Sequence, residues 1–194
     1  MLASSISYAF NPIIMWAAFL VTLFYGTQLS PEQQQALWLP IATLELIVPA
    51  ILLGVFMKLG LISDVDVTNV KQRRLFFVLV LLAHTLSFAL LVMYGSKESF
   101  ELRGMGLAVE VVGTIITFFW KISGHLAVTS FLTGALIILL GWQWAWMLLL
   151  LPIIAWSRVV LKRHTVMQTL AGSVLPLGIM MLGILMIRFV EGTL

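Results

Sequence analysis

Apolar residues run along this chain in long segments that short polar stretches separate. A helix that crosses a membrane needs about 20 mainly apolar residues, with a range of about 17 to 25. That rule predicts segments at 8–26, 36–56, 75–94, 105–120, 126–140, 142–156 and 166–189. The fifth and sixth are short, and one of them could tilt or extend through its flanks. The pattern therefore predicts an all-α, polytopic transmembrane helix bundle with six to seven spans.

The composition supports a membrane protein. Of the 194 residues, 61% are hydrophobic and 10% are charged, against about 25% charged in an average soluble domain. The absence of cysteine excludes disulfides, thiolate metal sites and a cysteine nucleophile. The few cations sit at the ends of apolar runs, so we expect no nucleic-acid partner. Without an internal repeat or a long linker, we expect a single domain over 1–194.

Three polar islands interrupt the apolar segments. The first island is "SDVDVTNVKQRR" (63–74), the second is "KISGH" (121–125) and the third is "SRVVLKRH" (157–164). If all seven segments cross the membrane, the islands follow the second, fourth and sixth crossings. We therefore expect the three islands on the same membrane face.

The third island contains an arginine and a histidine close to a further polar residue. Arg158 and His164 lie six residues apart, which on one straight helix would turn them about 240° from each other, so we expect a bend between them. His164 and Gln168 are spaced i and i+4, and on a helix they would share a face. Ala171 and Gly172 extend that face with the small residues typical of close packing between membrane helices.

The other two islands offer groups that suit an anion. Ser123 and Gly124 precede His125 at an expected helix N-terminus, where free backbone N–H groups and the helix dipole favour negative charge. Arginine forks match phosphate oxygens better than lysine does. Two histidines beside such groups can perform phosphoryl transfer, with one attacking phosphorus and the other protonating the leaving oxygen. The nearby cations are Lys71, Arg73, Arg74 and Lys121.

"SGH" (123–125), followed by "SR", five residues and "H" (157–164), resembles the second and third signature motifs of the type 2 phosphatidic acid phosphatase (PAP2) family. The similarity covers about 64–177. The resemblance implies a transmembrane helix bundle that removes phosphate from lipid phosphates or prenyl diphosphates without a metal or another cofactor. We accordingly expect a lipid or prenyl phosphate substrate, contact with membrane lipids, and a phosphohistidine intermediate.

The resemblance also implies roles for individual residues. His164 is similar to the nucleophile and His125 to the general acid, while Arg158, Ser123 and the Gly124 amide would hold the phosphate. In the family an aspartate stands four residues after the nucleophile, and here that catalytic position is Gln168. The remaining expected phosphate ligands are Lys71, Arg73, Arg74 and Lys121. We expect Arg158, His125, His164 and Arg73 or Arg74 to meet in one pocket, with the Gln168 amide oxygen towards the His164 ring.

One alternative function remains open. A chain with glutamine at position 168 could be a catalytically weak or inactive protein that binds or moves phosphorylated lipids.

Glu45 and Glu110 lie inside expected spans, where an ionisable group is a functional candidate or pairs with another polar group. His84, at mid-span, is expected to be structural.

The loop charges predict an orientation. Most lysines and arginines outside the spans fall on the face that carries the three islands, which favours a cytoplasmic position for that face. We expect an integral protein of the cytoplasmic membrane of a prokaryote.

Overall fold

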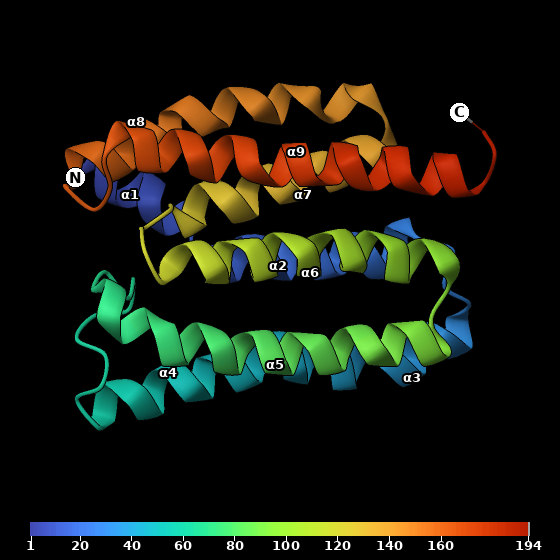
Figure 1. Cartoon of the computed structure of the whole chain (residues 1–194), viewed down its shortest axis with the longest axis horizontal. Helices are drawn as coiled ribbons and strands as arrows, with labels where there is room; N and C mark the ends of the chain where they lie inside the picture. Colours follow the sequence, from blue (N-terminus) through green and yellow to red (C-terminus); the bar gives the residue numbers. More distant parts are fainter. Residues whose placement is uncertain (194) are drawn as a thin grey trace. The chain divides into compact units, whose positions relative to one another are not determined.

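The structure of the chain is a computed structural model that describes residues 1–193 (Figure 1). This part of the chain is helical and contains no β-strand. The helices are α1 (Leu2–Ala9), α2 (Pro12–Gly26), α3 (Pro31–Ala42), η1 (Thr43–Ile47), α4 (Val48–Lys58), α5 (Val70–Tyr94), α6 (Lys97–Thr117), α7 (Gly124–Leu140), η2 (Trp142–Leu149), α8 (Leu150–Val160) and α9 (Val166–Val190).

Within residues 1–193, five helical stretches are long and apolar enough to cross a membrane, which makes this an integral membrane protein. They are Leu2–Gly26, Pro31–Lys58, Val70–Tyr94, Trp142–Val160 and Val166–Val190. The sequence predicted six to seven spans. The difference lies in α7, which has 17 residues, and in α6, which has 21 residues and carries five charged side chains: Lys97, Glu98, Glu101, Arg103 and Glu110.

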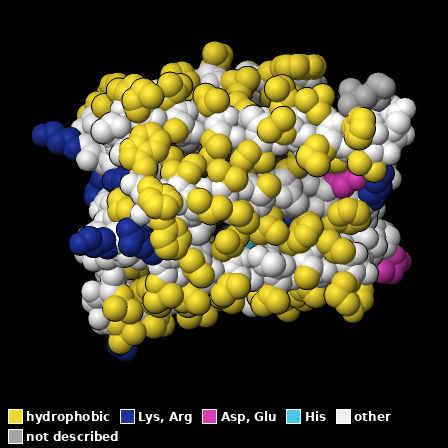
Figure 2. All heavy atoms as spheres, viewed as in Figure 1, with side chains coloured by type: hydrophobic (Ala, Val, Ile, Leu, Met, Phe, Trp, Pro, Cys, Tyr) yellow, Lys and Arg dark blue, Asp and Glu magenta, His cyan; other side chains and the backbone are white. Residues whose placement is uncertain are grey.

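The surface chemistry agrees with a lipid environment. Large hydrophobic side chains are exposed along the long helices, for example Leu82 and Leu86 in α5 and Met181 and Leu182 in α9. Figure 2 shows hydrophobic side chains over most of the visible surface, with the exposed charged side chains near the ends of helices. Such a surface is unfavourable in water and is suited to acyl chains.

The helices group into two compact units. The terminal unit comprises Met1–Phe19 with Ile122–Leu194, and the central unit comprises Leu20–Lys121. In the terminal unit α7 packs against α9 and α1 packs against α8, while in the central unit α5 packs against α6 and η1 (Figure 1). The single domain expected from the sequence stays a prediction.

A widened helical turn interrupts the second apolar segment of the central unit. η1 is π-helical, and the Val48 N–H bonds to the Thr43 carbonyl five residues earlier. Pro49 follows directly and has no N–H to donate, so the regular helical ladder is broken at this point. Glu45 lies in this turn, and its side chain is buried within the central unit.

Close backbone packing joins α7 to α9 in the terminal unit. A Cβ atom added at Gly172 would lie 2.7 Å from the Ser123 carbonyl oxygen and 3.3 Å from the Leu126 Cβ. Neither contact is the far end of a flexible side chain, so the backbone itself would have to move. The small residue expected at this position therefore sets how closely the two helices approach.

We predict that Gly172→Ala lowers the stability of the protein by about 1–3 kcal/mol, the usual range for overpacking. Gly178→Ala is the matched control, because a Cβ there has nothing within 4 Å and alanine is the better helix former. Thermal unfolding in detergent, followed by tryptophan fluorescence, should show a lower midpoint for Gly172→Ala only. Equal midpoints for the two variants would contradict this account of the helix contact.

Candidate functional site

The third island forms a tight turn between two helices. α8 ends at Val160, and the chain turns through Lys162, which has a left-handed φ of 55°. The N–H groups of Arg163 and His164 both donate to the Arg158 carbonyl oxygen, at 3.0 and 3.3 Å. The expected bend between Arg158 and His164 is confirmed. The turn therefore holds the backbone of the buried His164 against the last turn of α8.

The expected helical relation between His164 and Gln168 is wrong, because α9 begins only at Val166. Thr165 is the N-cap and forms a capping box with Gln168: the Gln168 N–H donates to Thr165 Oγ1 at 3.3 Å, and the Thr165 N–H donates to Gln168 Oε1 at 3.1 Å. The amide oxygen that was expected at the His164 ring is therefore bound by backbone. The T-x-x-Q pattern is a capping-box signature and was readable in the sequence.

The second island begins α7 as predicted, with Ser123 at the N-cap. The Ser123 N–H donates to the Gln168 carbonyl oxygen at 3.2 Å, which joins the second island to the first turn of α9. The Ser123 side chain makes no cap bond. Its Oγ is buried and has no hydrogen-bond partner among the described residues. The start of α7 thus offers a spare hydroxyl beside the N–H groups of a first helical turn, which lack partners within the helix.

Arg158 and His125 meet in the terminal unit. Arg158 is 1% exposed, and its Nη1 donates to Ser7 Oγ at 2.5 Å and lies 3.4 Å from His125 Nε2. Ser7 Oγ lies 3.4 Å from the same Nε2. Because a guanidinium can only donate, the Nε2 that faces it acts as an acceptor, as in a neutral imidazole. Three elements, α1, α7 and α8, therefore supply this site.

Ser7 is a residue that the sequence reasoning missed. It belongs to no motif, and its helix lies far from α7 and α8 along the chain. The available signal was weak: three serines at positions 4, 5 and 7 make α1 more polar than the apolar run that follows. Ser157 provides a second anchor for this helix, because its hydroxyl donates to the Ala3 carbonyl oxygen at 2.7 Å.

The expected ligands from the first island lie in the central unit. Arg73 is buried, and it donates to the Val67 and Asp66 carbonyl oxygens and lies over the Phe77 ring. The Arg73 side chain therefore stabilises the loop that precedes α5. Arg74 donates to the Phe118 carbonyl oxygen at 2.9 Å. Lys71 is exposed, and Lys121, from the second island, is half-buried. That Arg73 or Arg74 joins the histidines, and that these four cations bind phosphate, stays a prediction.

The residues that the structure does bring to one end of the terminal unit are Ser7, Ser123, Gly124, His125, Arg158 and His164. No family model matches the chain, and neither a curated protein nor a solved structure matches it. Any assignment of function therefore depends on this geometry and on the motifs that the residues form.

We predict that Gln168→Ala destabilises the start of α9 by about 1 kcal/mol, the usual cost of losing a helix cap. Gln168→Glu keeps an acceptor for the Thr165 N–H and should retain wild-type stability. Amide hydrogen exchange in the first turn of α9 should be faster in Gln168→Ala and unchanged in Gln168→Glu. Identical exchange in the two variants would rule out the capping role.

Proposed function

We propose that this protein is a membrane phosphatase of lipid or prenyl phosphates that acts through a phosphohistidine and needs no metal. The observation that carries the proposal is the position of Arg158 against His125, beside the N-terminus of α7 with its spare Ser123 hydroxyl. The resemblance of the two islands to the PAP2 motifs supports it. As part of the same proposal, the protein resides in the cytoplasmic membrane of a prokaryote.

The arrangement suits a phosphate group. A guanidinium presents parallel donors that match two phosphate oxygens, and the first turn of α7 adds N–H groups and a favourable dipole. Ser7 is an uncharged partner of Arg158, so a phosphate oxygen can replace it as acceptor and bring the negative charge that Ser7 lacks. Binding of the substrate would then break the hydrogen bond between Arg158 and Ser7.

The proposed reaction uses the two histidines in turn. A ring nitrogen of His164 attacks phosphorus, the N–P bond forms, and the bond from phosphorus to the leaving oxygen breaks. His125 gives its proton to that oxygen. Phosphate at Arg158 favours the required imidazolium, because the anion offsets the guanidinium beside the ring. Water then hydrolyses the phosphohistidine, with His125 as base.

A second candidate function follows from Gln168. Its amide closes the cap of α9 and adds no negative charge near His164. An acid-to-amide change in a serine-protease triad costs about 10⁴ in turnover. A site with this residue could hold phosphorylated lipid headgroups without cleaving them.

Phosphate release from phosphatidic acid and from prenyl phosphates, by the full chain in detergent with excess chelator, tests the first function. We predict that His164→Asn abolishes release, and that Arg158→Lys lowers turnover about 10²- to 10³-fold, as for the loss of one strong charge-stabilising donor. Arg163→Lys, an exposed neighbour in the same turn, is the control and should stay near wild type. Full activity in His164→Asn would refute the phosphohistidine.

Gln168→Asp separates the two functions. If the protein is a working phosphatase, Gln168 acts on the helix cap, and we predict a turnover within several-fold of wild type. If it is a binder, wild type retains phosphatidic acid vesicles over phosphatidylcholine vesicles without releasing phosphate. A gain of phosphate release on Gln168→Asp from an inactive wild type would then support the second function and contradict the first.

A further inference from the structure

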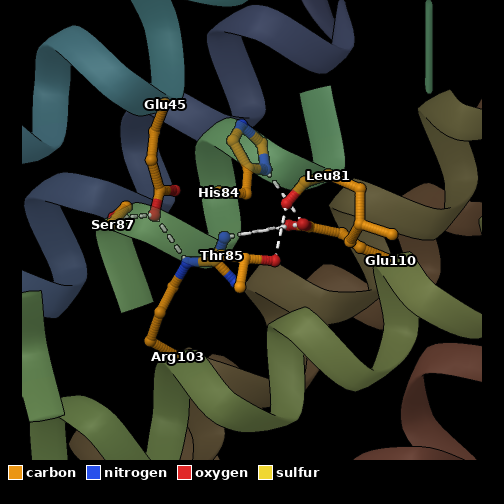
Figure 3. Close-up of polar contacts among 7 residues, drawn as sticks. All are labelled: Glu45, Leu81, His84, Thr85, Ser87, Arg103 and Glu110. Carbon is orange, nitrogen blue, oxygen red and sulfur yellow. Dashed lines mark hydrogen bonds and ion pairs between the residues drawn. The ribbon is translucent and has the colours of Figure 1, made fainter. Parts of the chain in front are cut away.

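A cluster of charged side chains lies inside the central unit (Figure 3). Arg103 of α6 donates from Nε to Glu45 Oε1 at 2.6 Å and from Nη2 to Glu110 Oε2 at 3.5 Å, and the same Nη2 forms an ion pair with Glu110 Oε1 at 3.3 Å. Glu110 Oε2 lies 2.9 Å from His84 Nδ1. The Ser87 hydroxyl donates to the Glu45 carboxylate. Four ionisable groups from η1, α5 and α6 are thus joined in one chain of contacts.

The cluster lies deep along the helices. His84 is at position 15 of the 25 residues of α5, so at a rise of 1.5 Å per residue it lies about 21 Å from Val70 and about 15 Å from Tyr94. Arg103 and Glu45 are fully buried. Ionisable groups at this depth are costly and mark functional sites in membrane proteins.

The charges of the cluster do not balance without a proton. Two carboxylates carry −2 and Arg103 carries +1, which leaves −1; one added proton brings the sum to zero. An uncompensated charge in an apolar interior is strongly disfavoured. We propose that the cluster is a proton-binding site, and that it takes up and releases one proton at the contact between Glu110 Oε2 and His84 Nδ1.

The roles within the cluster follow from burial. Glu45 is held by Arg103 and Ser87 in the π-helical turn and has no exposed surface, so it is the fixed counter-ion of the guanidinium. π-Helical turns are frequent at functional sites. The Glu110 side chain is 20% exposed, against 8% for His84. The contact is therefore more accessible from the Glu110 side. When the proton is bound, the carboxylate and imidazole become a carboxylate and an imidazolium.

Other charges of the packed helices leave this count unchanged. Glu101 lies on the same helix as Arg103, but it pairs with Lys97 at 3.8 Å. The remaining charged residues of the surrounding helices lie within about two turns of a helix end: Glu32 in α3, Lys58 in α4, Lys71, Arg73 and Arg74 in α5, and Lys97 and Glu98 in α6.

The three histidines of the chain make the proton directly observable. In the full chain labelled with ¹⁵N-histidine and held in lipid nanodiscs, single His→Asn variants assign each ring signal. Across roughly pH 5 to 9, the range in which histidine titrates, we predict one charged-to-neutral transition at His84. In Glu110→Gln the remaining charges, Glu45 and Arg103, already cancel. His84 should then lose its proton at least one pH unit lower, a tenfold weaker proton affinity.

Glu101→Gln is the matched control, a carboxylate on the same helix outside the cluster, and it should leave the transition unchanged. In Glu45→Gln the remaining charges, Glu110 and Arg103, also cancel. This variant therefore replaces Glu110→Gln in the test if Glu110→Gln fails to fold. The proposal is overturned by a His84 ring that keeps one charge state over the whole range in wild type. It is equally overturned if Glu101→Gln shifts the transition as much as Glu110→Gln does. Phosphate release takes no part in this test, so the outcome is independent of the proposed function.

Discussion

Burial of a guanidinium is the constraint on which both compact units depend. Arg103 is 0% exposed and Arg158 is 1% exposed, and a guanidinium in an apolar interior must be hydrogen-bonded to offset the loss of water. The acceptors come from other helices in each case. Arg103 binds α6 to η1, and Arg158 binds α8 to α1 and faces α7. Each arginine therefore positions helices that apolar side chains alone would leave free to slide.

The two arginines differ in the partners that they contact. Arg103 contacts the carboxylates of Glu45 and Glu110, and with His84 these groups form one connected set of ionisable side chains. Ser7 and His125 satisfy donors of Arg158 with uncharged atoms. Hydrogen bonds to charged acceptors are stronger than those to uncharged ones, so an anion is a stronger partner for a guanidinium than Ser7 or His125. The contacts of Arg158 with Ser7 and His125 therefore agree with the phosphate site that we propose in the terminal unit.

The sequence predicted the features that depend on local patterns. The apolar runs located the helices to within a few residues at most ends, and the spacing of Arg158 and His164 predicted the turn between α8 and α9. The sequence did not predict features that arise from tertiary contacts. Ser7 reaches Arg158 only because α1 folds back onto α8. The apolar run placed the start of α9 correctly at Val166, but the helical relation expected between His164 and Gln168 was wrong, because the cap at Thr165 leaves His164 outside the helix.

Depth along the helices decides which ligand each polar group can serve. The Arg158 site lies at the beginning of α7 and the end of α8, where few residues separate it from the surroundings of the helix ends. A group as large as phosphate needs such a position. The Arg103 cluster lies at mid-helix among closely packed side chains, and protein interiors of this kind leave few voids larger than a water molecule. A proton needs no void, because it moves along existing hydrogen bonds. The helix-end position therefore favours an anionic headgroup, and the mid-helix position favours a proton.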